Sequence, residues 1–292
     1  MSIMMDEAIA DKGDNPLLAH CLKDLEADTL LLPTLPDISV KIRKAINDVK
    51  ANNARIAKVV QVDPAITGRL IHIANSPLYL GRKKIESCPE ALTRMGLKAA
   101  QHFITSFALK GVFIAKSVYI RKRMQDLWQH SSYVAAICAV LAHKTHGFDP
   151  DRAMLAGLVH DIGVVPILTY ADRHPELITD PRQIEETIQD LRTRIGIMIM
   201  RRWNFPADFD DVVGEAENWW RQGTQEPDYS DLVILSQLHS FVGTLQIHRY
   251  PRMDEIPAYR KVLADAAGAD MSKDVLGLAR EEIAQIQKML TN

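Results

Sequence analysis

The spacing of apolar residues is the feature of this chain that most limits its fold. From residue 38 onward they recur every three or four positions, as in Ile38, Ile42 and Ile46, which places them on one face of an α-helix. No segment of the sequence shows the sustained alternation of apolar and polar residues that a half-buried strand requires. The sequence therefore predicts an all-α protein of about a dozen short helices packed against one another.

Capping residues indicate where several of these helices begin. Asn53 is expected to cap one helix, and Asp63 precedes a proline at the first position of the next, as helix N-termini favour. Ser87 and Glu90 have the spacing of a capping box, in which each side chain binds the backbone of the other residue. A longer helix is predicted over residues 125–146.

The length of the chain suggests more than one structural unit. Single hydrophobic cores stop growing near ~250 to 300 residues, and this chain has 292. We expect a loose lead-in over residues 1–20, an N-terminal helical subdomain over 21–120, and a second helical core with C-terminal helices over 121–292. The boundary is placed where apolar residues give way to basic ones, between Gly111 and Arg123.

Charge and cysteine content exclude several classes of protein. The 35 basic residues balance 37 acidic ones without a long block of like charge, so non-specific nucleic-acid binding is not expected. Cys21, Cys88 and Cys138 are isolated and odd in number, which favours a reducing cytoplasm over a disulfide framework. The longest uninterrupted apolar run, residues 133–142, is far shorter than the ~20 residues of a membrane helix. The prediction is a cytoplasmic protein with no membrane partner.

The dipeptide His160-Asp161 is the strongest chemical signal. It follows an apolar stretch over residues 153–159, and it offers an imidazole and a carboxylate, two ligand types of hydrolases that activate water on a divalent ion. Phosphate-binding glycine loops and the serine-hydrolase elbow are missing from the sequence, which argues against nucleotide-triphosphate, dinucleotide and serine-hydrolase chemistry.

Seven motifs, in this order, resemble the HDOD domain, the HD-related output domain of bacterial signalling proteins, over about residues 25 to 250. They are LPTLP (32–36), VDPAIT (62–67), IANSP (73–77), ALTRMG (91–96), LWQHS (127–131), AGLVHDIG (156–163) and RWNFP (202–206). The resemblance implies a multi-helix globule of the HD-domain, phosphodiesterase-like kind with an N-terminal helical subdomain. HD phosphohydrolases cleave phosphate esters on one or two divalent metals, whereas HDOD proteins commonly lack part of the ligand set and act as signalling or scaffolding modules.

The resemblance also implies which residues would bind a metal. His130 matches the first histidine of the HD pattern, and His160 and Asp161 match the His-Asp pair. The distant aspartate falls on Gln237, and a neutral amide is a poor replacement because it supplies no negative charge to a divalent cation. Asp231 lies six residues earlier, on the wrong part of the helix.

Other positions of the family's site depart further from the pattern. Arg192 stands where many relatives carry a histidine, and a fixed cation opposes metal binding. Glu215 and Glu217 occupy a region where a histidine pair is expected, and Val164 stands where cyclic-dinucleotide hydrolases carry a lysine. We expect no cofactor, although a divalent metal on the remnant cluster stays open as the alternative.

Three functions follow in order of preference. The first is a non-catalytic bacterial signalling module that acts through protein partners, and homo-oligomers are possible. Under this hypothesis, His130, His160 and Asp161 form a buried hydrogen-bonded cluster that connects helices. The second is a metal-dependent phosphohydrolase in which these three residues hold one ion. The third is nucleotide binding without hydrolysis. Elsewhere, Asn75 and Ser76 are interpreted as a helix C-cap and turn, with ligand binding as the alternative.

Overall fold

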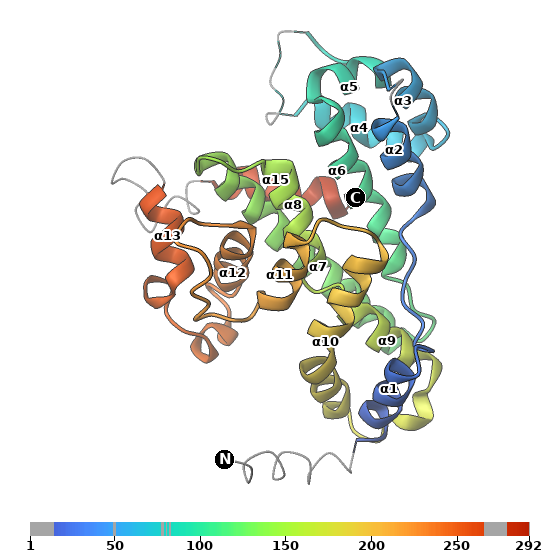
Figure 1. The fold of residues 1–292 in the computed structure, drawn as a ribbon, viewed down its shortest axis with the longest axis vertical. Coiled ribbons are helices and arrows are strands. Elements are labelled where there is room, and N and C mark those ends of the chain that lie inside the picture. The colour runs from blue at the N-terminus through green and yellow to red at the C-terminus, as the bar shows by residue number, and fades with distance from the viewer. Residues whose placement is uncertain are drawn as a thin grey trace.

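The computed structural model describes residues 15–48, 51–76, 79, 81, 83–265 and 279–291 (Figure 1). Within these ranges the chain is helical and contains no strand, which confirms the all-α prediction. The α-helices are α1 (Pro16–Glu26), α2 (Asp37–Asn47), α3 (Asn53–Val60), α4 (Pro64–Ala74), α5 (Cys88–Met95), α6 (Leu97–Leu109), α7 (Val118–Lys144), α8 (Pro150–Val159), α9 (Val164–Arg173), α10 (Arg182–Arg202), α11 (Asp208–Glu215), α12 (Tyr229–Ser240), α13 (Pro257–Asp265) and α15 (Arg280–Thr291).

Local capping explains where several helices start. The Asp63 side chain accepts hydrogen bonds from two backbone N–H groups at the start of α4, and Ser87 accepts one at the start of α5, as predicted. The second half of the predicted capping box differs, because the Glu90 carboxylate accepts from the Glu86 N–H and the Ser87 hydroxyl. The predicted cap of α3 is wrong by one residue. Asn52 accepts the hydrogen bond from the Arg55 N–H, while the Asn53 amide donates to the Thr93 hydroxyl at 2.9 Å.

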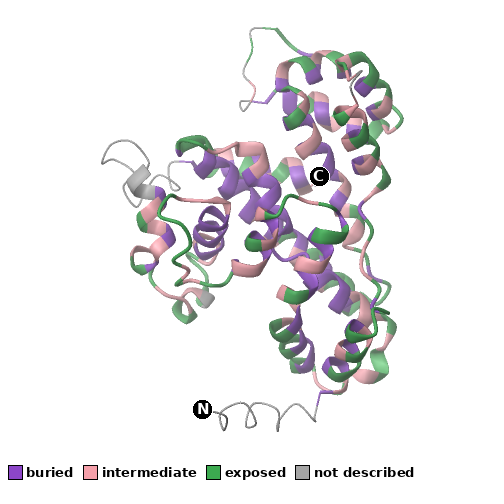
Figure 2. Cartoon of the chain, viewed as in Figure 1, coloured by how far each residue is buried: buried purple, intermediate pink, exposed green. Residues whose placement is uncertain are grey.

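Helix α7 is the central helix and begins earlier than predicted. It starts at Val118, capped by Ser117, because Ile120 and Met124 continue the buried face that reaches Trp128. Helices α8, α12 and α15 pack against α7, and the buried residues concentrate along these elements (Figure 2). This helix therefore lies at the centre of the packing formed by α8, α12 and α15.

Helices α2 to α6 pack together at one end of the molecule, whereas α1 lies at the other end against α9 and α10 (Figure 1). The predicted loose lead-in over residues 1–20 is wrong for its last part, because α1 begins at Pro16. The helix is fixed there by the buried Leu17 and by Asn15, whose amide donates to the Gln183 carbonyl at 2.9 Å. Residues 1–14 of the predicted lead-in lie outside the described ranges.

Polar contacts join the two ends of the molecule. The Arg43 guanidinium donates to the Trp203 carbonyl at 2.6 Å, and the Trp203 indole donates to the Pro33 carbonyl at 2.9 Å. The LPTLP and RWNFP motifs, far apart in sequence, are thereby in contact. Tyr79 adds a second link by donating to the Asp151 carboxylate of α8.

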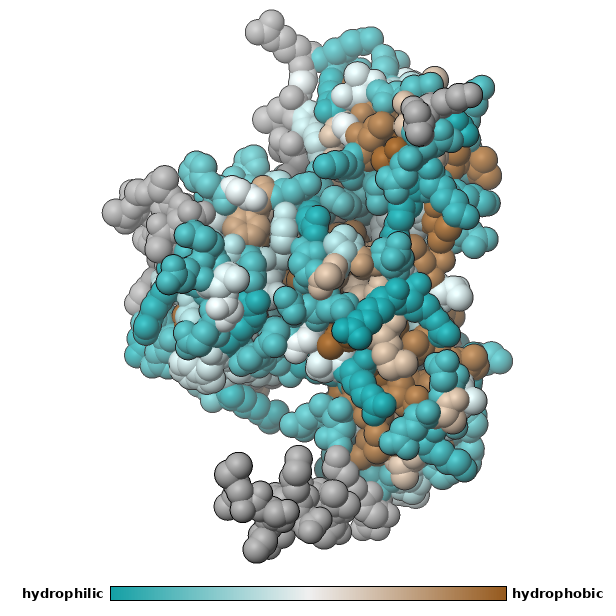
Figure 3. All heavy atoms as spheres, viewed as in Figure 1, coloured by the Kyte–Doolittle hydropathy of each residue, from teal (hydrophilic) through white to brown (hydrophobic). Residues whose placement is uncertain are grey.

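The apolar stretch Pro150–Arg173 is long and apolar enough to cross a membrane by length and composition, and 89% of its apolar 18-residue window is buried inside the protein. It is divided into α8 and α9 by the turn that holds His160 and Asp161, so its apolarity is accounted for by packing in the core. Hydrophilic side chains cover most of the face shown in Figure 3, with hydrophobic ones mainly along the α1–α2 side. The three cysteines are buried and free.

Candidate functional site

The structure brings the three predicted ligands together. His130 lies in α7, and His160 and Asp161 form the turn between α8 and α9. One ligand atom from each lies within 4.8 Å of the other two. Asp161 Oδ2 is 3.2 Å from His160 Nε2 and 3.9 Å from His130 Nε2. Sequence spacing alone did not predict this convergence, which depends on how α7 and α8 cross.

Two glycines permit the close packing that sets the position of this turn. A Cβ atom at Gly157 would lie 2.7 Å from the Cα of Ala135 in α7. A Cβ atom at Gly163 would lie only 1.9 Å from the backbone oxygen of Arg192 in α10. Neither position has room for a side chain. The α8–α9 turn is therefore held directly against both α7 and α10.

The tautomer of His160 follows from its hydrogen bond. His160 Nδ1 lies 2.7 Å from the Gly157 carbonyl oxygen, which only accepts, so Nδ1 carries a proton. Burial acts to lower the pKa of His160, but the Asp161 carboxylate beside Nε2 outweighs it and raises that pKa. This nitrogen is buried and has no hydrogen-bond partner. Metal-ligating histidines are commonly held in this way, with one ring N–H bonded to a backbone carbonyl and the other nitrogen left for the metal.

Arg192 occupies the other side of the Asp161 carboxylate. Its guanidinium donates to Asp161 Oδ1 at 2.9 Å, with side chains that are 14% and 10% exposed, and it also contacts Glu217. The carboxylate charge is therefore already balanced by the protein's own cation. Unit charges about 4 Å apart interact by about 4 kcal/mol near a protein surface, so this arginine opposes any divalent ion on the same carboxylate.

The charges of the cluster shift the pKa values of its members. Burial acts to raise the pKa of Asp161, but His160, Arg192 and His130 outweigh it and hold that pKa well below its usual range. Burial lowers the pKa of His130 to about 4, with His160 and Arg192 adding to the effect and Asp161 opposing it. At neutral pH, Asp161 is thus ionised and His130 is neutral.

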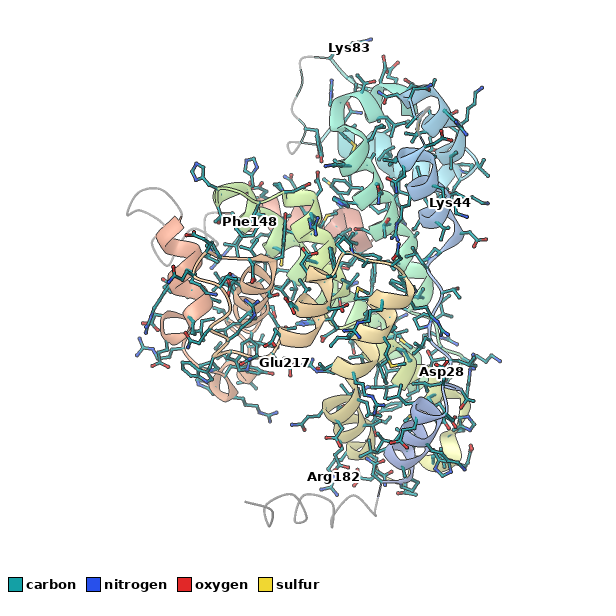
Figure 4. All side chains as sticks on the ribbon, in the orientation of Figure 1. Asp28, Lys44, Lys83, Phe148, Arg182 and Glu217 are labelled. Carbon is teal, nitrogen blue, oxygen red and sulfur yellow. The ribbon has the colours of Figure 1, made fainter. Side chains whose placement is uncertain are left out.

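Gln237 lies on α12 and belongs to the same polar network. It is buried, and its amide nitrogen donates to Glu217 Oε1 at 3.4 Å, while its amide oxygen has no partner. Glu217, labelled in Figure 4, thus links Arg192 of α10 to Gln237 of α12. Gln237, at the position expected for a fourth ligand, is therefore hydrogen-bonded to a member of an ion pair and supplies no charge.

Asp231 is not part of the cluster. Its carboxylate forms a capping box with Asp228 at the start of α12 and lies 2.7 Å from Lys261 and 3.5 Å from Arg221. The side chain is fully buried by these contacts. Asp231 therefore joins α12 to Lys261 of α13, and it lies away from the metal-ligand position, as expected from the sequence.

An aromatic wall beside His130 was not predicted. The His130 ring stacks on Phe241 at 5.9 Å, Phe241 stacks on Tyr250 at 4.3 Å, and Trp219 meets Tyr250 edge-on at 5.3 Å. Phe241 lies one helical turn after Gln237, a spacing that could have indicated a shared face. These rings shield one side of His130 from solvent and contribute to the low pKa of its imidazole.

The three ligand atoms of the cluster suit a single metal ion. Two imidazole nitrogens and one carboxylate oxygen suit a single ion of the zinc or manganese kind, and the unpartnered His160 Nε2 agrees with that use. Within the described ranges, no further histidine, cysteine or carboxylate joins the three residues. The residues therefore fit one weakly held ion and do not fit a two-metal centre.

The all-helical fold and the His-Asp cluster at the α8–α9 turn define a protein of the HD type. The model of the HDOD domain matches residues 32–219, more than half of the chain, and the chain belongs to the HDOD family. This confirms the resemblance carried by the seven motifs.

Solved structures share the fold over nearly the whole chain. A candidate metal-dependent phosphohydrolase from Shewanella amazonensis SB2B is 26% identical, with a TM-score of 0.81 and coverage of 95% of this chain and 99% of its own. An HDOD domain protein with unknown function from Geobacter sulfurreducens is 22% identical, with a TM-score of 0.68 and coverage of 96% and 98%.

A curated relative matches a shorter part of the chain. It is an uncharacterized protein of Treponema pallidum (strain Nichols), 23% identical over 192 residues. The match covers 60% of this chain and 35% of the relative, so the chain spans about a third of that protein's length.

Proposed function

We propose that this HDOD protein is a non-catalytic regulatory module of the bacterial cytoplasm that acts through contacts with signalling proteins. The observation that carries the proposal is the ion pair between Arg192 and Asp161. The corresponding carboxylate of an HD enzyme would bind a metal ion. In this protein the buried Arg192 guanidinium instead donates a hydrogen bond to Oδ1 of Asp161. Gln237 adds no compensating charge at the fourth position.

The cluster has a structural use that requires no metal. Asp161 contacts the guanidinium of α10 and approaches the imidazoles of α7 and of its own turn. Through Glu217 the same network reaches α12. Buried polar networks of this kind fix the relative positions of the helices that contribute to them. A rigid helical core of this type is suited to presenting a constant surface to a partner.

A second candidate is a phosphohydrolase with a reduced site, and one observation favours it. His160 Nε2 is buried, lacks a hydrogen-bond partner and faces Asp161. The Shewanella neighbour, 26% identical, carries a metal-dependent phosphohydrolase name. His130, His160 and Asp161 would hold the ion, which would lower the pKa of a bound water and so supply a hydroxide nucleophile. Nucleotide binding at this cluster without hydrolysis stays a prediction.

A hydrolysis screen separates the first two functions. The chain is purified without chelator, supplied with Mn²⁺, and tested on phosphomonoesters, phosphodiesters, nucleotides and cyclic dinucleotides. Asp161→Ala is the test variant, and Asp211→Ala removes an exposed carboxylate of α11 as a matched control. The proposal expects wild-type rates equal to those of Asp161→Ala. Turnover that is lost in Asp161→Ala and kept in Asp211→Ala would establish the enzyme instead.

A further inference from the structure

A cleft between the N-terminal helices and α15 lies apart from the His-Asp cluster. Its volume is about 680 Å³, within the range of about 300 to 1,000 Å³ that is typical of small-molecule sites. Its walls come from α4, α6 and α15, and the C-terminal end of α15 lies beside α6 in Figure 1. The lining residues are Gly68, Arg69, His72, Ile73, Asn75, Ser76, Phe107, Gln285, Lys288 and Met289.

The charged side chains that line this cleft are cationic. Arg69 and Lys288 line it from α4 and α15, His72 adds an imidazole, and none of the lining residues that the structure describes is acidic. Lys110 lies close enough to Arg69 for their charges to interact, and its ammonium group donates to the Thr291 carbonyl at the end of α15. In a chain whose total charge is nearly balanced, several cationic groups gathered along one cleft favour an anionic ligand.

Ser76 supplies an independent indication of a ligand. The residue is 6% exposed, and its hydroxyl oxygen is buried without a hydrogen-bond partner. The neighbouring Asn75 is satisfied, because its amide donates to the Ile85 carbonyl and accepts from the Ile85 N–H, both at 2.8 Å. Asn75 is therefore the structural C-cap of α4 that the sequence predicted. A buried hydroxyl left unpaired at the wall of a cleft is unfavourable unless a ligand or a water molecule pairs with it.

The remaining wall of the cleft is apolar. Ile73, Phe107 and Met289 line it, and the Arg69 guanidinium lies over the Phe107 ring at 5.4 Å from the centroid. An aromatic ring and a thioether suit a flat, partly apolar group. The cleft therefore combines a cationic, hydroxyl-bearing part with an apolar part, and it is larger than an inorganic anion requires.

We propose that this cleft binds a nucleoside monophosphate. The phosphate would contact Lys288, Arg69 and the Ser76 hydroxyl, and the base would pack against Phe107 and Met289. Helix α15 packs on α7, whereas α4 packs with α5 and α6. A ligand held by both α4 and α15 stabilises the packing of the N-terminal helices on α15, because it binds only when they are together. Ligand occupancy would then determine how rigidly the N-terminal helices sit on the central core.

The proposal is tested by titrating the full chain with AMP, GMP, CMP and UMP in a calorimeter, and by following thermal unfolding with each. Inorganic phosphate and adenosine serve as probes of the two halves of the ligand. Ser76→Ala removes the unpaired hydroxyl, and Lys288→Glu reverses an exposed charge of the cleft. Lys144→Glu makes the same charge change at an exposed position of α7 that does not line the cleft.

We expect saturable binding of at least one monophosphate and a rise in the unfolding temperature. Ser76→Ala should weaken binding roughly tenfold, as the loss of a hydrogen bond to a charged group does, without lowering the stability of the free protein. Lys288→Glu should weaken binding by at least as much, and Lys144→Glu should leave it unchanged. The proposal is overturned if none of the four nucleotides binds, if phosphate or adenosine binds equally well, or if Ser76→Ala and Lys288→Glu bind like wild type.

Discussion

Replacing Arg192 with methionine tests the network at the site most sharply. The substitution keeps a long side chain and removes the guanidinium that contacts Asp161 and Glu217. Asp161 then stays buried with its charge unbalanced by any arginine. The structure predicts a large loss of stability, because the side chain of Asp161 is only 10% exposed.

The size of the loss follows from the geometry of the pair. The donor and acceptor atoms are 2.9 Å apart, and with charge centres about 4 Å apart the attraction is about 4 kcal/mol. Removing one partner of a buried pair also leaves the other desolvated, and measured losses are about 3 to 5 kcal/mol. Arg192→Met should therefore lower the free energy of unfolding by about 3 to 5 kcal/mol.

Equilibrium unfolding in urea measures this change. Adding Asp161→Asn to Arg192→Met should recover most of the loss, because it removes the unbalanced charge. Arg182→Met is the matched control, since Arg182 pairs with Asp180 on the surface with 84% of its side chain exposed, and it should change stability little. The reasoning is refuted if Arg192→Met costs no more than Arg182→Met, or if the double variant is no more stable than the single one.

Two further predictions concern the packing around the site and between the two ends. Burial raises the pKa of Asp151 from 3.8 to about 6, so this group favours the folded state below pH ~4 and its contribution is lost as the pH rises through 6. Asp151→Asn should remove this dependence of the unfolding free energy on pH and stabilise the protein at pH 7 by up to about 3 kcal/mol. Urea unfolding between pH 4 and 8 measures it, and a pH dependence unchanged from wild type would contradict the prediction. Gly163→Ala would place a Cβ 1.9 Å from the Arg192 oxygen and should cost more than about 3 kcal/mol or prevent folding. Gly111→Ala, with no atom within 4 Å, should be nearly neutral, and equal thermal stabilities of the two variants would contradict the assigned packing.

The sequence predicted the helices well where the signals are local. Asp63 and Ser87 cap their helices through hydrogen bonds to residues two or three positions away, so their effect can be inferred without tertiary structure. The start of α7 was missed because its basic residues near 121–123 suggested a boundary. Arg121 and Lys122 in fact lie on the exposed side of a helix whose buried face already runs through Ile120.

The site was only partly predictable, because its contacts are non-local. His130, His160 and Asp161 were identified from the family pattern, and Arg192 was expected to oppose a metal. That Arg192 binds Asp161 and Glu217 together depends on how α10 packs against the α8–α9 turn. That packing in turn requires Gly163, a role that its sequence position does not reveal.

Metal titration of paired variants tests the central claim most directly, namely that Arg192 and Gln237 disable the His-Asp cluster as a metal centre. Mn²⁺ binding is measured by calorimetry for wild type and for the double variant Arg192→Gln with Gln237→Asp. We predict weak binding by wild type and one-to-one binding at least tenfold tighter in the double variant, lost again when Asp161→Ala is added. Tight one-to-one binding by the wild-type chain, with no gain in the double variant, would contradict the claim.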